Sequence, residues 1–183
     1  MAFAGRAGFA SSVFALLLPL AGCSTAIKQV YYEVRGAKSD IMLISQFQSD
    51  TLAAYQSLRF EPATTTVGDR ICPPRLLHHY DEQLADASRE LRDAYPGGDP
   101  ALRITTELLY FQNKGLLSGA LLLARSRMYD ATDDRLVVDA LILTESKSFR
   151  EGSRGDLAES SVKALRRFLR ERQAPRSELL DEL

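Results

Sequence analysis

The sequence predicts an α+β fold: a two-layer sandwich in which a mixed sheet of four to five strands carries two helices on one face. One observation is the order of apolar patterns, which reads strand, long helix, three strands, helix. A second is the length of 183 residues, which suits a single domain. Apolar and charged fractions of 45% and 26% are those of a soluble globular protein, and they exclude wholesale disorder and a polytopic membrane protein.

The first element is a predicted signal peptide over residues 1–22. Arg6 precedes an apolar run, Val13 to Ala21, which is much shorter than the roughly 20 residues that span a bilayer. The run ends at Leu20-Ala21-Gly22-Cys23, which resembles the lipobox of bacterial lipoproteins. That resemblance implies cleavage after Gly22, a diacylglyceryl thioether on Cys23 and acylation of the new amine. The alternative is an ordinary signal peptide with a cysteine near its end.

Acylation of Cys23 would place the protein at a membrane. Two or three acyl chains hold a protein stably on a membrane, whereas one binds only marginally. Ser24 stands where an inner-membrane retention signal would have Asp, so resemblance to the enterobacterial sorting rule favours the periplasmic face of the outer membrane. Lipidation of Cys23 would leave Cys72 alone and exclude an intrachain disulfide.

Residues 23–50 are predicted to form the lipidated cysteine and a tether, and residues 51–172 the single domain. Asp40 to Phe47, inside the tether range, is an apolar run of strand length. The β-rich segment from Ser57 to Val67 contains Pro62, which predicts an edge strand or a bulge.

The long helix begins at Pro73 and Pro74, where a missing N–H costs nothing. Its apolar stripe has spacings of three and four residues, and Pro96 to Pro100 ends it. The stripe contains Leu76, Tyr80, Leu84, Ala87, Leu91 and Ala94.

Three strands are predicted next, at about 102–110, 120–129 and 136–144. A final helix follows over about 155–172, with Asp156 as its N-cap. Residues 173–183 are expected to be a flexible tail.

The sequence contains no pattern that indicates catalysis, and we expect no enzyme, metal site or cofactor. His78 and His79 are adjacent, so on a helix they point about 100° apart and cannot share one ion from the same face. No Gly-x-Ser-x-Gly motif is present, and no histidine pattern accompanies Cys72, so we interpret that cysteine as buried or inert.

Two surfaces are candidates for partner binding. The outer face of the last helix carries Lys163, Arg166, Arg167 and Arg170, which we term the basic stripe. It is either a solvated helix face or a contact for anionic headgroups or an acidic partner. The second surface is the uncovered sheet face, where Tyr110 and Tyr129 would supply apolar area. The net charge of −1 argues against a nucleic acid partner.

The lipobox, the strand SLRFEPATTT, the long helix, the strand ALRITTELLYF and the hairpin together resemble small proteobacterial lipoproteins of unknown function. Their domain is similar to the anticodon-binding-like α/β domain also found in lipoprotein activators of penicillin-binding proteins. This chain departs from the family in having DATDD at the turn and only Gly115 and Gly119 in the hairpin.

The resemblance implies a non-enzymatic binding or scaffolding role at the cell envelope, with an envelope protein or a glycan as partner. The alternative is an auxiliary lipoprotein subunit of an envelope transport or secretion machine. That role would require a large apolar groove between the sheet and the helices for hydrophobic cargo. The sequence leaves the oligomeric state open.

Overall fold

A computed structural model of the chain describes residues 37–46, 52–113, 119–146 and 153–173. The predicted signal peptide, Cys23 and nearly all of the predicted tail lie outside these ranges. Within them, no helix is long and apolar enough to cross a membrane.

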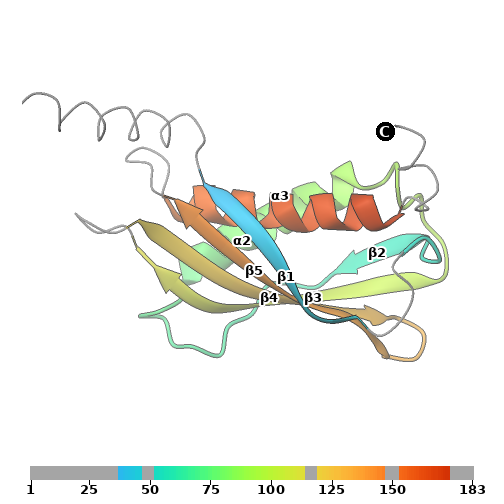
Figure 1. The fold of residues 1–183 in the computed structure, drawn as a ribbon, viewed down its shortest axis with the longest axis horizontal. Helices are drawn as coiled ribbons and strands as arrows, with labels where there is room; N and C mark the ends of the chain where they lie inside the picture. The colour runs from blue at the N-terminus through green and yellow to red at the C-terminus, as the bar shows by residue number, and fades with distance from the viewer. Residues whose placement is uncertain (1–36, 47–51, 114–118, 147–152, 174–183) are drawn as a thin grey trace, which may run out of the picture.

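The described residues form one five-stranded sheet with two helices on one of its faces (Figure 1). The strands lie in the order β1-β5-β4-β3-β2. The predicted α+β sandwich with a mixed sheet is therefore confirmed. The elements are β1 (Lys38–Gln46), β2 (Ser57–Phe60), α2 (Pro74–Glu90), β3 (Ala101–Gln112), β4 (Ala120–Asp130), β5 (Leu136–Ser146) and α3 (Arg154–Gln173).

The connections follow the predicted topology. β2 and β3 are parallel and are joined through α2, whereas β3, β4 and β5 form an antiparallel meander. A crossover helix between parallel neighbours packs back onto the sheet, and the meander places its strands side by side. α2 and α3 consequently lie together on the same face of the sheet (Figure 1).

The folded domain begins earlier than the predicted boundary at residue 51. β1 lies within the range 23–50 that was assigned to the tether, and it pairs antiparallel with β5 from Lys38 opposite Glu145 to Gln46 opposite Val138. Its apolar run has strand length, and pairing with β5 satisfies the backbone groups along one of its sides. The part of the predicted tether that precedes residue 37 lies outside the described residues.

β2 is an edge strand, as Pro62 predicted. The chain leaves the regular ladder after Phe60 and then returns to β3, where the Thr64 N–H donates to the Thr106 carbonyl at 2.9 Å. Thr64 also forms an isolated bridge with Glu107. The proline thus interrupts the edge without releasing the segment from the sheet.

α2 has Pro74 at its first turn, as predicted, and buries Leu76, Tyr80, Leu84 and Ala87. The helix ends at Glu90, and Leu91 is its C-cap. Leu91 and Tyr95 are buried beyond that end, and the Tyr95 N–H donates to the Leu91 carbonyl at 2.9 Å. The apolar spacing in the sequence therefore extends beyond the end of α2, because the turn that follows the helix also buries its apolar side chains.

The N-cap of α3 is Ser153, and the assignment of Asp156 was wrong by three residues. The Ser153 Oγ accepts from the Asp156 N–H at 3.2 Å, while Asp156 Oδ2 accepts from the Ser153 N–H at 2.9 Å. This reciprocal pair is a capping box, and its Ser-x-x-Asp spacing is visible in the sequence.

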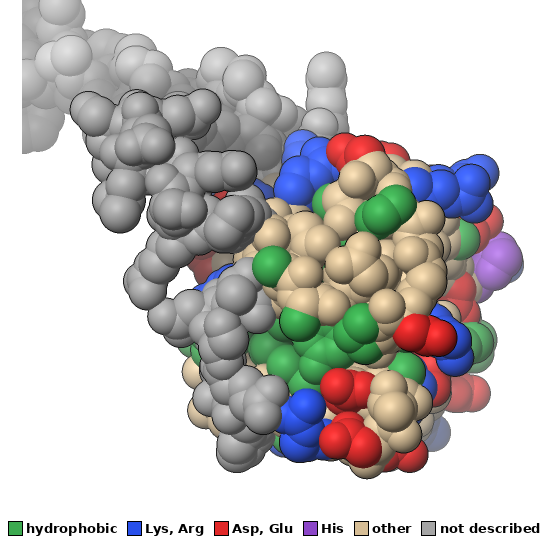
Figure 2. Space-filling view, turned by 90° about the vertical axis from the view of Figure 1, so that its right-hand side faces the viewer, with side chains coloured by type: hydrophobic (Ala, Val, Ile, Leu, Met, Phe, Trp, Pro, Cys, Tyr) green, Lys and Arg blue, Asp and Glu red, His purple; other side chains and the backbone are tan. Residues whose placement is uncertain are grey.

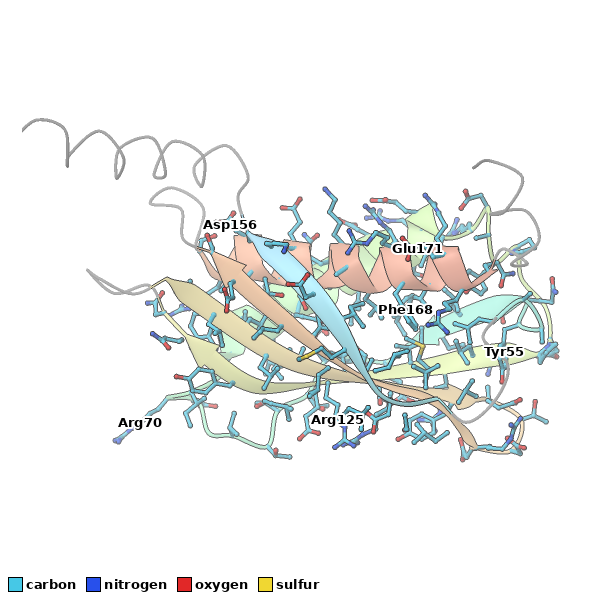
Figure 3. All side chains as sticks on the ribbon, in the orientation of Figure 1. Tyr55, Arg70, Arg125, Asp156, Phe168 and Glu171 are labelled. Carbon is cyan, nitrogen blue, oxygen red and sulfur yellow. The ribbon has the colours of Figure 1, made fainter. Side chains whose placement is uncertain are left out.

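Side chains from both helices and the inner sheet face fill the space between the two layers. Fully buried members include Leu76, Leu102, Leu108, Leu122, Ile142, Leu157 and Leu165. Phe168 points from α3 into this interior, whereas Arg125 lies on the opposite side of the sheet (Figure 3). The pocket that hydrophobic cargo would require is absent between the layers, as far as the described residues show.

Candidate interaction site

The outer edge of β1 exposes more large apolar side chains than any other described element. Met42 and Ile44 are each 50% exposed, and Leu43 is 41% exposed. Strand edges carry backbone N–H and C=O groups ready to pair with another chain, and most proteins protect them. Three neighbouring exposed apolar side chains on such an edge indicate an interaction surface.

The two edge strands of the sheet differ in how well they are protected from pairing with a strand of another chain. β2 has only four residues and is followed by Pro62 and a strand-like return to β3. β1 has nine residues, with one irregularity between Leu43 and Ser45. Short length and proline are devices that prevent edge pairing, and β1 has neither of them within the described residues.

Hydroxyl groups hold β1 firmly against the rest of the domain. The buried Ser39 Oγ lies 2.7 Å from Thr144 Oγ1 of β5 and 2.9 Å from Ser160 Oγ of α3. Ser160 Oγ also donates to the Ala37 carbonyl at 3.0 Å. The exposed side chains of β1 therefore sit on a preorganised strand, which lowers the entropic cost of binding.

An open groove of about 620 Å³ runs between the start of β1 and the outer face of α3. The predicted basic stripe lines it, together with Lys38, Asp40 and Glu171. The sequence prediction thus placed these four cations on one surface correctly. The sequence analysis did not predict that β1 forms the other wall of this groove.

Three of the four cations in the basic stripe already have carboxylate partners. Arg166 forms an ion pair with Glu90 of α2, and Arg170 Nη2 lies 2.8 Å from the Glu90 carbonyl and 3.3 Å from Asp93. Arg167 Nε is 3.9 Å from Glu171. Lys163 is exposed and has no ion-pair partner in the described part of the chain. The stripe therefore joins the two helices as much as it faces solvent.

The uncovered sheet face has a charged half and an apolar half. Arg103, Arg125 and Arg127 form ion pairs there with Asp134, Asp139 and Glu107, respectively. Leu121, Leu123, Leu141 and Leu143 are half-buried on the same face, nearer the other end of the strands.

The two tyrosines predicted on this face differ in availability. Tyr110 is 42% exposed, whereas Tyr129 is half-buried and lies under the Arg103 guanidinium, 4.7 Å from ring centroid to Cζ. Tyr110 could contact a partner directly, but Tyr129 is already engaged within the domain.

One ion pair of this face, between Arg125 and Asp139, is bidentate. Arg125 donates through Nε at 2.9 Å and through Nη2 at 2.6 Å. Asp139 is only 4% exposed, and hydrogen bonding by Arg125 holds the pKa of its carboxyl below the usual value despite burial. The pair satisfies both partners, so its role is to hold β4 and β5 together.

The two histidines and the cysteine that the sequence analysis considered for catalysis do not come together in one site. His78 Nε2 and His79 Nδ1 each lie 3.3 Å from Glu82 on the exposed side of α2. No group of three or more His, Cys, Asp or Glu side chains that could hold a metal exists among the described residues. Cys72 is buried, and burial raises the pKa of its thiol, which disfavours the reactive thiolate.

The end of the molecule that lies to the right in Figure 1 also carries apolar side chains. Figure 2 shows a small hydrophobic patch there that is interrupted and bordered by Lys, Arg, Asp and Glu side chains. This mixture is typical of a solvated surface.

Sequence comparison gives no family: no family model matches the chain, and no curated protein matches it. Solved structures share its architecture. The chain is similar in fold to PelC. A PelC dodecamer from Paraburkholderia phytofirmans superposes with a TM-score of 0.50 at 13% identity, covering 75% of this chain and 99% of that one.

Two other structures align less well. A candidate lipoprotein from Caulobacter crescentus has a TM-score of 0.38 at 14% identity, over 64% of this chain and 91% of that one. A Xanthomonas campestris protein of family DUF330 has a TM-score of 0.38 at 13% identity, over 69% and 88%. At these identities the likeness concerns the fold alone.

Proposed function

We propose that this protein is a lipid-anchored lipoprotein on the periplasmic face of the outer membrane, with a non-enzymatic binding role at the cell envelope. The observation that carries the binding role is the open edge of β1 with Met42, Leu43 and Ile44 exposed. The lipobox at Leu20–Cys23 carries the anchoring.

Chain connectivity supports the combination of anchor and binding edge. Thirteen residues lie between Cys23 and Ala37, which lines the groove beside β1. Even fully extended they span no more than about 50 Å. An acylated Cys23 would therefore keep the β1 edge close to the membrane and to neighbouring envelope proteins.

A binding role is preferred over transport of hydrophobic cargo because the two layers enclose a filled core. Leu76, Leu108 and Leu165 are among the side chains with at most 1% exposure in that interior. PelC is a dodecamer, so this architecture can be built into an assembly of copies. We propose that contact between copies is part of the binding role here too.

Fractionation of cells that express the full chain tests the anchor. Cys23→Ser should move the protein from the membrane pellet to the soluble periplasmic fraction, because no acyl chain can be attached. Cys72→Ala is the matched control and should stay in the pellet, since Cys72 is buried in the domain. A Cys23→Ser protein that still pellets would contradict the lipobox interpretation.

A second substitution tests which membrane holds the anchor. By the sorting rule, Ser24→Asp should shift the protein from the outer-membrane to the inner-membrane band of a density gradient. An unchanged outer-membrane position would show that sorting follows another signal.

A further inference from the structure

We infer that the outer edge of β1 and the exposed face of α3 together form a surface that rests on the anionic phospholipids of the membrane holding the anchor. This inference rests on the proposed function and names the ligand of the β1 edge. Three observations carry it: the cations of the groove, the apolar side chains beside them, and the point where the chain enters the domain. We term this the β1/α3 surface, and it consists of Lys38, Met42, Leu43, Ile44, Lys163 and Arg167.

The first observation is the positive charge of the groove between β1 and α3. Five cations and two carboxylates line this groove. Two of the cations, Arg166 and Arg170, also form ion pairs with Glu90 and Asp93 on the side of α2. Counting these two carboxylates as well still leaves one excess positive charge. Lys163 supplies it, since it is exposed and has no ion-pair partner among the described residues.

The two carboxylates that line the groove hold their cations only loosely. Asp40 lies 3.6 Å from Lys38, and Glu171 lies 3.9 Å from Arg167. All four side chains are at least 65% exposed. Exposed pairs of this kind contribute little free energy, so Lys38 and Arg167 are able to exchange these carboxylates for lipid phosphates.

The second observation is that exposed apolar side chains adjoin these cations. Met42 and Ile44 are each 50% exposed, and Leu43 is 41% exposed. Leu43 and Arg167 line one further hollow of about 310 Å³ between β1 and α3, which joins the apolar edge to the cations. β1 and α3 lie side by side (Figure 1). Binding at a membrane interface combines burial of apolar side chains with attraction of cations to anionic headgroups, and this surface offers both.

The third observation is the place where the chain enters the domain. Ala37 lines the same groove, and thirteen residues lie between it and Cys23. They span at most about 50 Å. Acylation of Cys23 would therefore make contact between this surface and the membrane an intramolecular event with a high effective concentration. A diffusing acidic protein has no such advantage, and for this reason we commit the surface to lipid.

The backbone of β1 limits how deep the surface lies. An open sheet edge does not enter the hydrocarbon region, because its N–H and C=O groups would lack partners there. β1 therefore lies at the level of the headgroups, where water and phosphate oxygens accept from its N–H groups, and only side chains reach the acyl boundary. Since β1 and β2 are the two edges of the sheet, this orientation places β2 farthest from the membrane.

Vesicle binding by the full chain carrying Cys23→Ser tests the surface in the absence of acyl chains. This chain should bind vesicles that contain phosphatidylglycerol more tightly than vesicles of phosphatidylcholine alone, and salt should reduce the difference. In the same background, Lys163→Glu should weaken binding to the anionic vesicles by about ten-fold, because it reverses a charge near their surface. Arg70→Glu is the matched control and should change binding little, since Arg70 projects from a loop away from α3 (Figure 3).

Removal of apolar area tests the β1 part of the surface. Met42→Ser/Ile44→Ser should weaken vesicle binding by about ten-fold, because two half-exposed apolar side chains no longer enter the interface. This loss should persist at high salt, since burial of apolar area is not screened. Ile71→Ser is the matched control, because Ile71 is 40% exposed on the same loop as Arg70.

A fluorescent label reports the orientation of the acylated chain itself. On anionic vesicles, an environment-sensitive fluorophore attached to Met42→Cys should shift its emission to shorter wavelength and be protected from iodide quenching. The same fluorophore attached to Ile71→Cys should stay accessible to iodide. The wild type controls for labelling of the buried Cys72, and the thioether would block Cys23.

Equal binding to both kinds of vesicle, an unchanged affinity of Lys163→Glu, or equal quenching of the two labels would each overturn the inference. Loss of an acidic protein from Lys163→Glu, with vesicle binding unchanged, would assign the surface to a protein partner and overturn it too. Failure of the anchor is seen separately. A high-salt wash should release a Cys23→Ser chain that only this surface holds, whereas a chain that still pellets after the wash contradicts the lipobox interpretation.

Discussion

Removal of the Arg125 guanidinium should destabilise the domain by leaving a buried carboxylate without its partner. Arg125→Met deletes two hydrogen bonds, of 2.9 and 2.6 Å, to Asp139, which is 4% exposed. A fully buried pair broken on one side costs about 3–5 kcal/mol. Because the Arg125 side chain is 33% exposed, we expect a smaller loss of about 2–4 kcal/mol in the free energy of unfolding.

Equilibrium urea unfolding followed by circular dichroism measures this loss. Arg89→Met is the matched control, since it breaks the exposed ion pair with Asp86 on α2 and should cost less than about 0.5 kcal/mol. Arg125→Met/Asp139→Leu should lie within about 1 kcal/mol of the wild type, because apolar replacement of a whole pair removes the stranded charge.

The pH dependence gives an independent check with a defined sign. In the wild type the pKa of Asp139 is lowered, so the pair stabilises the fold above the ordinary carboxyl pKa and loses its contribution as the pH falls. In Arg125→Met the carboxyl binds a proton at higher pH, because burial without a cation disfavours its charge. The stability difference between the two proteins should shrink on acidification. Equal stability of Arg125→Met and the wild type at pH 7 would refute the reasoning.

Two further predictions concern the core. Leu84→Ala should cost about 2–5 kcal/mol, because Leu84 is buried in the middle of α2, whereas His78→Ala and His79→Ala should be nearly neutral; urea unfolding distinguishes these outcomes. Burial raises the pKa of Tyr80 to about 12 from 10.0, so the contribution of Tyr80 to stability should be constant below pH 10 and fall between pH 10 and pH 12. Tyr80→Phe should weaken this alkaline loss, and an unchanged profile would contradict the role of the phenol.

The sequence alone determined the architecture because local patterns encode it. The period of the α2 stripe, the prolines at its start and the alternation in β3 to β5 each report one element. The strand–helix–strand order then fixed the parallel pairing of β2 and β3 through the handedness rule. The anchor at Cys23 is likewise a local pattern, and it stays a prediction because it lies outside the described residues.

The candidate interaction surface at β1 depended on which elements are neighbours, and no local pattern contains that information. The run Asp40 to Phe47 indicated a strand, but only the sheet order shows that this strand is an edge and that Met42 and Ile44 face outward. A central strand with the same sequence would bury these side chains.

Tertiary neighbours also explain why the ion pairs of the basic stripe could not be predicted from the sequence. Helical spacing placed Lys163, Arg166, Arg167 and Arg170 on one face, and the structure agrees. The ion-pair partners of Arg166 and Arg170, however, are Glu90 at the end of α2 and Asp93 in the turn that follows it, about 75 to 80 residues earlier in the chain. Periodicity gives the direction of a side chain within its own helix, whereas its charge partner depends on how two helices pack. Tertiary structure therefore decided that Lys163 is the stripe cation without an ion-pair partner among the described residues.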